Sequence, residues 1–421
     1  MIVTIARMAI PAALVAYSAW SAAQALPDVG SRIEQAHWTA KSWLDGEATA
    51  AIDSTWSDTL PHRDFASGIV GAGRWLALGE GKEGVVPGRD GWLFTAEEAR
   101  SMPEPLSASL ARIAVLKDTL NEMGVALTIV PLAGKADIYR DETGNLPMAD
   151  DLKARYDDVL ASLRAMGIDT VDSRTALVHE AKVEQVFYAS DTHWTREGAA
   201  AVARAIAADL PQGETEFTPV ETETIAFHGD LTKFITTADY ADAVGLREET
   251  AHLFKAEAAG GADGADIFGS GDDLFAAAAM PTVLVGTSYS ANPDWSFQES
   301  LKIALQSDIV NYAQEGRGPV KPFLKMLADP AFRDTPPKTV IWEIPVRYLS
   351  DPTIWEPEEA QKDQPILAGG MLTDDLARIE ADVPVTLEAN GILQAASLES
   401  ERLTGHLAAL NLNNKGETHV D

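Results

Sequence analysis

Apolar residues recur along the chain with two different periods. Between residues 106 and 210, stretches with helical spacing alternate with short, nearly continuous apolar runs, and this alternation returns between residues 283 and 344. Amphipathic helices between continuously apolar strands are typical of a mostly parallel sheet covered on both faces, which predicts a three-layer α/β/α fold. The predicted strands are residues 92–94 (a turn and short strand), 125–131, 168–171, 283–285, 309–313 and 339–344, and the predicted helices are residues 33–56, 106–120, 150–166, 195–210, 297–305 and 320–327.

The first 25 residues have the pattern of an export signal. Arg7 is the only charge before an apolar run, and Ala23-Gln24-Ala25 supplies the small-x-small pattern of a cleavage site. The run is short and broken by polar residues, whereas a spanning helix needs about 20 mostly apolar residues. We therefore predict an exported protein whose signal is residues 1–25, with an uncleaved membrane anchor as the alternative.

Composition changes abruptly in three later stretches. Residues 71–91 are rich in glycine, and residues 256–279 are rich in Gly, Ala and Asp, which favours a flexible surface insertion. Residues 351–421 are polar, with clusters of Pro, Glu and Asp, and they are too few for a self-sufficient core. The sequence predicts one main domain at residues 26–350 and a short C-terminal appendage at residues 351–421.

The charge balance excludes one class of partner. The chain has 33 Lys and Arg residues against 64 Asp and Glu residues, a formal net charge of −31. Nucleic acid is not an expected partner, because binding it requires a basic face that neutralises phosphates. The chain contains no cysteine, which excludes disulfides, thiolate chemistry and cysteine-based zinc sites.

An Asp-x-His pair stands just before a predicted helix. In an extended segment, Asp191 and His193 point the same way, so the carboxylate can accept a hydrogen bond from one ring nitrogen and leave the other as a base. The alternative is that Asp191 or Thr195 only caps the following helix while His193 lies at the surface.

A candidate nucleophile follows an apolar strand. Residues 283–285 lead into Gly286, Thr287 and Ser288, which places Ser288 at a carboxyl end of the sheet, where ligands bind in open α/β folds. Backbone amides after the glycine could face an oxyanion. An ordinary loop serine is the alternative. Pairing with His193 favours a nucleophile that forms an acyl-serine, as in serine-type acyl transfer.

Five short segments in a fixed order carry a resemblance to a known family. The chain resembles the AlgJ/AlgX family of periplasmic alginate O-acetyltransferases, whose fold is like that of SGNH hydrolases, over roughly residues 60–350. The segments are Gly88-Arg89-Asp90-Gly91-Trp92-Leu93-Phe94, Asp191-Thr192-His193-Trp194, Gly229-Asp230-Leu231, Gly286-Thr287-Ser288-Tyr289-Ser290 and Trp342-Glu343-Ile344-Pro345.

The resemblance implies a function and partners. In this family the Asp-x-His pair precedes the serine, as here, which implies a catalytic role for Asp191, His193 and Ser288. It also implies an exopolysaccharide as acceptor and a membrane-bound O-acyltransferase (MBOAT) in the acetyl donor route, and no cofactor is expected. The tail is too short for the carbohydrate-binding module of AlgX, so the chain is closer to AlgJ.

Residues that contact the sugar or the oxyanion are less sharply defined by the pattern. Aromatic and basic side chains near the catalytic segments could stack on or hydrogen-bond a glycan, although such residues more often belong to the core. The candidates for glycan contact are Trp194, Tyr289, Trp295 and Arg317, and those for the oxyanion are the amides of Ser288 or Tyr289 and the side chain of Asn311.

Three other interpretations stay open. His228 and Asp230 could join Asp191 and His193 as a metal site with nitrogen and oxygen ligands. The same triad could pass the acyl group to water, which would make the protein a carbohydrate acetylesterase. The chain could also be a non-catalytic glycan-binding or scaffold member of an export complex.

Overall fold

The computed structural model of the chain describes residues 2–35, 38–100, 106–144, 148–259 and 282–355. Contacts divide the chain into two units. One unit holds the residues up to Lys82 together with Thr232–Leu246, and the other holds Glu83–Leu231 and the described residues from Arg247 onward.

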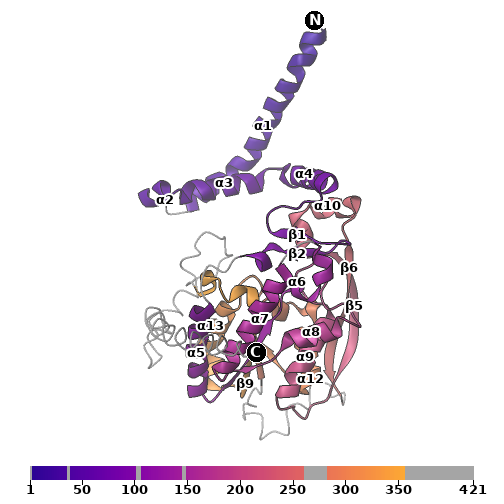
Figure 1. Ribbon diagram of the computed structural model, residues 1–421. Coiled ribbons are helices and arrows are strands. Elements are labelled where there is room, and N and C mark those ends of the chain that lie inside the picture. Colours follow the sequence, from indigo (N-terminus) through magenta and orange to yellow (C-terminus); the bar gives the residue numbers. More distant parts are fainter. Residues whose placement is uncertain (1, 36–37, 101–105, 145–147, 260–281, 356–421) are drawn as a thin grey trace, which may run out of the picture. The chain divides into compact units, whose positions relative to one another are not determined.

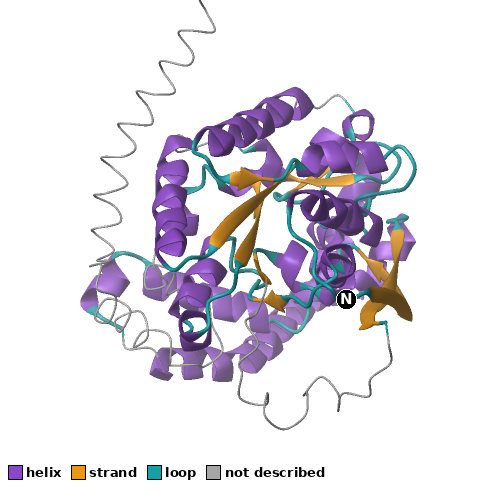
Figure 2. Ribbon diagram, turned by 90° about the horizontal axis from the view of Figure 1, so that it is seen from below, coloured by secondary structure: helices purple, strands orange, loops and turns teal. Residues whose placement is uncertain are grey.

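A five-stranded parallel sheet forms the centre of the second unit. Its order is β4-β3-β9-β7-β8. The last described strand, β9, therefore lies between β3 from the first half of the sequence and β7 from the second half. Helices lie on both sides of these strands (Figure 2), which confirms the predicted fold class. The bounds are β3 (Ala126–Leu132), β4 (Asp169–Thr170), β7 (Thr282–Val285), β8 (Val310–Asn311) and β9 (Thr339–Pro345).

The alternation of side chains along each strand builds two cores. In β9, Val340, Trp342 and Ile344 join the core on one face, while Ile341 joins the core on the other. One face is covered by α5 (Leu106–Glu122), α7 (Met148–Ala165), α13 (Val320–Ala328) and α14 (Pro330–Asp334), and the other by α8 (Ser173–Glu180), α9 (Arg196–Asp209) and α12 (Phe297–Leu305) (Figure 1). The three central strands, β3, β9 and β7, are therefore buried on both sides and mostly apolar, as expected for the middle of a parallel sheet.

A long antiparallel hairpin was not predicted from the sequence. It joins β5 (Phe217–His228) to β6 (Glu248–Ala258), with a register shift between Glu221 and Glu223. The predicted insertion at residues 256–279 is wrong at its start, because residues 256–258 belong to β6. Residues 260–279 lie outside the described residues.

Several shorter elements complete the second unit. A small hairpin pairs β1 with β2, and short helical turns follow the ends of the strands of the main sheet. The bounds are β1 (Val85–Pro87), β2 (Leu93–Thr95), the 3₁₀ helix η1 (Ala96–Ala99), α6 (Lys135–Ile138) and α11 (Ser288–Ala291).

The first unit is helical in its described residues: α1 (Ile2–Gln35), α2 (Ala40–Leu44), α3 (Glu47–Thr59), α4 (Arg63–Leu78) and α10 (Ala238–Ala241). The single helix predicted at residues 33–56 is wrong, because Gly46 at φ +83° separates α2 from α3. The glycine-rich stretch also begins inside α4, where Gly71 lies so close to the Ile235 carbonyl that a Cβ would meet its oxygen at 2.1 Å.

Two predicted segments are only partly tested. The predicted signal lies within α1, and among the described residues no helix has the length and apolarity needed to cross a membrane. Of the predicted C-terminal appendage, residues 351–355 are described, and residues 356–421 lie outside the described residues.

Candidate active site

The carboxyl edge of the sheet places Ser288. It is the first residue of α11, directly beyond β7, and Thr287 precedes it as the N-cap. Gly286 allows this turn, because a Cβ at that position would lie 2.6 Å from Oε2 of Glu343 on β9. Only glycine lets the end of β7 approach its neighbour so closely.

The Asp-x-His segment ends just before α9. Thr195 caps this helix by accepting a hydrogen bond from the Gly198 amide. The capping role in the alternative interpretation is therefore correct. The carboxylate of Asp191 has other hydrogen-bond partners, and His193 is 9% exposed rather than a surface residue.

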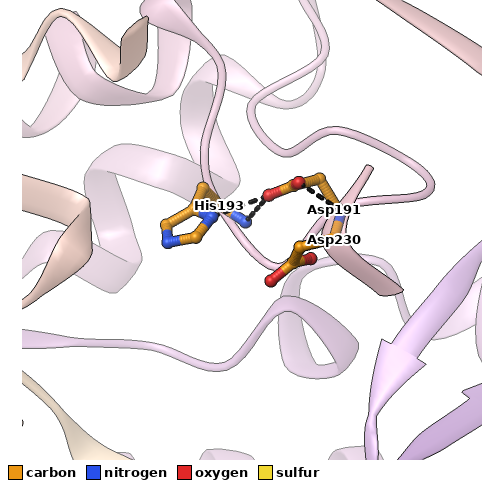
Figure 3. Close-up of side chains that lie close together, drawn as sticks. All are labelled: Asp191, His193 and Asp230. Carbon is orange, nitrogen blue, oxygen red and sulfur yellow. Dashed lines mark hydrogen bonds and ion pairs between the residues drawn. The ribbon is translucent and has the colours of Figure 1, made fainter. Parts of the chain in front are cut away.

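Three predicted residues meet at this edge in one chain of hydrogen bonds. Oδ1 of Asp191 lies 2.7 Å from Nδ1 of His193 and accepts the main-chain N–H of His193 at 2.8 Å. On the other side of the ring, Nε2 lies 2.7 Å from Oγ of Ser288. Figure 3 shows the facing carboxylate and ring, with Asp230 beside them. The convergence predicted from the sequence is present.

Opposing effects set the charge states of the two carboxylates. Burial acts to raise the pKa of Asp191, but the hydrogen bonds and charge of His193, with the amide of Asp230, outweigh it and hold that pKa below its usual value. The pKa of Asp230 is raised, because it is buried and lies near the negative charge of Asp191. The site therefore favours an ionised Asp191.

Two aromatic rings enclose the imidazole. Trp295 stacks on His193 with 4.9 Å between ring centroids and 16° between planes, and Tyr289 lies at 4.8 Å. The Tyr289 hydroxyl donates to the Thr192 carbonyl at 2.7 Å. Both rings are nearly fully buried, so in this structure they position the histidine and offer little surface to a glycan.

The other residues predicted to contact substrate have different places. Trp194 is fully buried and packs on Phe297, which corrects its expected role as a glycan contact. The Asn311 side chain donates to the carbonyl of Ser290 at 2.7 Å. It therefore supports α11, and the amide nitrogen that would stabilise an oxyanion already has a partner. Arg317 is half-buried between β8 and α13, and its role stays a prediction.

The predicted metal ligands converge only in part. Oxygen or nitrogen atoms of Asp191, His193 and Asp230 lie within 4.8 Å of one another, and among the described residues His228 is not part of this group. Oδ1 of Asp230 accepts from the amide and hydroxyl of Thr192, and the Asp191 carboxylate accepts from the amides of His193 and Asp230. The arrangement fits a hydrogen-bonded pair better than a four-ligand site.

A buried glutamate behind the serine was not predicted as a site residue. Glu343 is fully buried on β9 and accepts hydrogen bonds from the amide and hydroxyl of Thr287 and from the hydroxyl of Ser290 at 3.1 Å. Burial raises its pKa, although these hydrogen bonds and Arg347 oppose the shift. An isolated charge inside an otherwise apolar strand is the sequence signal that could have identified it.

Comparisons with known proteins fit this geometry. A family model described as "SGNH hydrolase-like domain, acetyltransferase AlgX" matches residues 85–346. "Probable alginate O-acetylase AlgJ" of Pseudomonas aeruginosa is 34% identical over 357 residues, covering 83% of this chain and 86% of that protein. "Alginate biosynthesis protein AlgX" of the same species is 27% identical over 273 residues, covering 63% of this chain and 56% of that protein.

A solved structure agrees with the fold. The O-acetyltransferase domain of Pseudomonas putida AlgJ superimposes with a TM-score of 0.55 at 31% identity, covering 66% of this chain and 98% of that domain. The fold and matches define the class of SGNH hydrolase-like acetyltransferases.

Within this class, the chain belongs to the AlgJ/AlgX family, and it is an O-acetyltransferase. The predicted family is confirmed, and the higher identity and coverage confirm that the chain is closer to AlgJ than to AlgX.

Proposed function

We propose that this chain is an exported O-acetyltransferase that transfers acetyl groups to hydroxyls of an alginate-like exopolysaccharide through an acetyl-Ser288 intermediate. The observation that carries the proposal is the continuous hydrogen-bond chain from Asp191 through His193 to Ser288. The acceptor class comes from the names of the relatives, which are alginate O-acetylases and alginate biosynthesis proteins.

The first half of the reaction forms the acetyl-enzyme. Oγ of Ser288 attacks the carbonyl carbon of the acetyl donor, while Nε2 of His193 takes the hydroxyl proton. Asp191 holds the ring and stabilises the imidazolium. The tetrahedral intermediate then collapses, the bond to the donor oxygen or sulfur breaks, and the imidazolium returns a proton to that leaving group.

The second half transfers the acetyl group. Nε2 of His193 takes the proton of a sugar hydroxyl as its oxygen attacks the acetyl-Ser288 carbonyl. A second tetrahedral intermediate releases Oγ of Ser288, which regains a proton from the imidazolium. One sugar ester forms for each donor consumed, and the enzyme returns to its starting state.

The oxyanion of both intermediates needs nearby donors. The amides of Ser290 and Ala291 donate to the Thr287 carbonyl, and the Thr287 amide donates to Glu343. Because those amides already donate to other groups, the amides of Ser288 and Tyr289 at the start of α11 are the favoured donors to the oxyanion.

The direct test removes the nucleophile. With a chromogenic acetyl ester, we expect Ser288→Ala to lower kcat by roughly 10⁴-fold or more, while the protein stays folded. The matched control is Ser290→Ala, which removes a hydroxyl of the same helix that contacts Glu343, and we expect a loss below about tenfold. Wild-type activity in Ser288→Ala would end the proposal.

Transfer and hydrolysis differ only in the acceptor. Purified protein is incubated with the chromogenic acetyl ester and alginate, and the polymer is analysed for ester-linked acetyl groups. We expect acetylated polymer with wild type and none with Ser288→Ala. Free acetate alone, at every polymer concentration, would favour the carbohydrate acetylesterase instead.

The location and donor route belong to the same proposal. The predicted signal at residues 1–25 supports a periplasmic protein, and acetyl groups delivered there would come through a membrane-bound O-acyltransferase (MBOAT). Mass spectrometry of the protein from fractionated cells tests this. A periplasmic form beginning after Ala25, or a membrane-bound form retaining Met1, fits the two predicted alternatives, and a cytoplasmic full-length form contradicts both.

A further inference from the structure

A buried lysine lies behind the Asp191–His193 pair. Lys135 begins α6, just after the carboxyl end of β3, and is only 2% exposed. Its ammonium donates to the carbonyl of Leu93 at 2.7 Å and to those of Ala189 and Asp191 at 2.8 Å each. The lysine therefore joins three points of the main chain, one of them in Asp191 itself.

The number of acceptors indicates the protonation state that this contact requires. An ammonium has three N–H donors, whereas a neutral amine has two. Only the charged form can donate to all three carbonyls at once; of the three, the Ala189 carbonyl also accepts from the Leu93 amide at 2.8 Å, whereas those of Leu93 and Asp191 face the lysine.

The surroundings supply opposing effects on that charge. Burial lowers the pKa of Lys135 to about 7, and nearby carboxylates act in the other direction. The rings of Trp92 and Phe94, at 5.2 and 5.3 Å, add cation–π attraction. The carboxylates that face the ammonium are those of Glu98, Asp191, Asp230 and Glu249.

The same main-chain segment is held from another side by an anion. Ser190 lies between two of the carbonyls that Lys135 binds, and its amide and hydroxyl donate to Oε1 of Glu249 at 2.7 and 3.0 Å. In residues 189–191, the carbonyls of Ala189 and Asp191 therefore accept from a cation, while the amide and hydroxyl of Ser190 donate to a carboxylate. This fixes the backbone just before His193.

We propose that Lys135 is a positioning residue for the acetyl transfer. Its ammonium holds the main chain of Asp191 so that the carboxylate meets the His193 ring, and its charge offsets the carboxylates gathered behind the pair. Lys135 does not touch the reacting atoms. The inference rests on the proposed function, because it concerns the same hydrogen-bonded pair.

The first test is Lys135→Met, which keeps the length of the side chain and removes its charge and donors. We expect kcat for the chromogenic ester to fall roughly 10- to 100-fold through misplacement of the pair, with KM unchanged. The acid limb of the kcat/KM profile should move to higher pH, because loss of a nearby cation favours proton binding by the Asp191–His193 pair. General loss of folded enzyme lowers activity without moving that limb.

The matched control is Lys153→Met, at an exposed lysine on α7 that pairs with Asp157. It removes the same functional group from the surface, so we expect wild-type kcat and pH profile. An unchanged kcat and pH profile in Lys135→Met would contradict the inference.

The absence of cysteine from the chain allows a chemical rescue. In Lys135→Cys, the single thiol is alkylated in denaturant with 2-bromoethylamine, which rebuilds a side chain of lysine length ending in an ammonium. Iodoacetamide gives a neutral derivative as control. After refolding side by side, we expect the aminoethylated protein to regain most of the lost activity and the neutral one to regain little. Equal activity of the two derivatives would overturn the inference.

Ser288→Ala in the same assay separates this inference from the proposed function. If Ser288→Ala is as active as wild type, the proposed acetyl-serine chemistry fails, whatever Lys135→Met does. If Ser288→Ala is inactive and Lys135→Met matches wild type in kcat and pH profile, only the role of Lys135 fails.

Discussion

The two halves of the site are each held by a buried titratable side chain, a lysine behind Asp191 and His193 and a glutamate behind Ser288. Behind His193, the proposed base, the ammonium of Lys135 donates to main-chain carbonyls, including that of Asp191. Behind Ser288, the proposed nucleophile, the carboxyl group of Glu343 accepts from the amide of Thr287 and from the hydroxyls of Thr287 and Ser290. Lys135 supplies donors to main-chain carbonyls, and Glu343 supplies acceptors to a main-chain amide and two hydroxyls, because buried donors and acceptors must find partners.

The comparison also separates the two halves by their electrostatics. The base half gathers the carboxylates of Glu98, Asp191, Glu249 and Asp230 around Lys135. The nucleophile half has one carboxylate that faces neutral donors, with Arg347 as an opposing charge. Charge changes should therefore affect the base half more strongly, and the following predictions run from the largest expected effect to the smallest.

After loss of the nucleophile, removal of the base should have the largest effect. We expect His193→Ala to lower kcat for the chromogenic ester by roughly 10⁴-fold, because no group then takes the Ser288 proton. His252→Ala is the control, since His252 is exposed on β6 and bonds to Thr224. Comparable losses in the two variants would break the assignment of the base.

The base half can be divided between its two acids. Asp191→Asn should lower kcat by roughly 10²- to 10⁴-fold, because the amide cannot hold the productive ring tautomer or stabilise the imidazolium. Asp230→Asn should cost less than about tenfold, since Asp230 bonds to Thr192 and not to the ring. Measuring kcat of both variants at saturating ester tests this ranking. A larger loss in Asp230→Asn than in Asp191→Asn would contradict the roles assigned to the two acids.

The nucleophile half is tested with Glu343→Gln. We expect roughly a tenfold loss of kcat, because Thr287 donates to both carboxyl oxygens of Glu343 and only one terminal atom of Gln can accept. Activity equal to wild type would show that this carboxylate does not position Ser288.

The same variant should also change how stability depends on pH. The folded pKa of Glu343 is raised above its usual 4.5, so the stabilisation from its protonated form is complete below pH 4.5 and is lost as pH rises through the folded value. As pH rises from 4.5 through the folded pKa, the unfolding free energy of wild type should therefore fall relative to that of Glu343→Gln. Denaturant titrations at several pH values measure it, and a constant difference contradicts the raised pKa.

Chelation should have the smallest effect. The Asp191 and Asp230 carboxylates are occupied by hydrogen-bond donors, so we expect protein treated with EDTA and dialysed to keep its ester activity. Loss on chelation with recovery on adding a divalent cation would support the metal site instead, and would remove the contrast between the two halves.

Local patterns were enough to predict the sheet and the convergence of Asp191, His193 and Ser288. Strands such as β3 and β9 are buried on both faces, which makes them continuous apolar runs. Asp191 and His193 are two residues apart, and Ser288 directly follows an apolar strand, so each signal is contained in a few neighbouring residues. The α/β class and these three positions were therefore accessible from sequence.

Contacts between distant segments were not accessible in the same way. Lys135 lies 56 residues from Asp191, and Glu343 lies 56 residues from Thr287, so no local spacing joins them. The β5–β6 hairpin was not predicted, because much of β5 is exposed and rich in Thr and Glu, without a clear apolar alternation. Burial also decided the role of Trp194, whose letters fit a sugar platform as well as a core.

The most direct test of the central claim is detection of the acetyl group on the enzyme. Wild-type protein is mixed with the chromogenic acetyl ester, quenched in acid during turnover, digested and analysed by mass spectrometry, with Ser288→Ala treated in parallel. We predict that the wild-type peptide containing Ser288 gains one acetyl group, which is lost when polysaccharide acceptor is added. Full turnover with no acetyl group on Ser288, or the same acetylation in Ser288→Ala, would contradict the account.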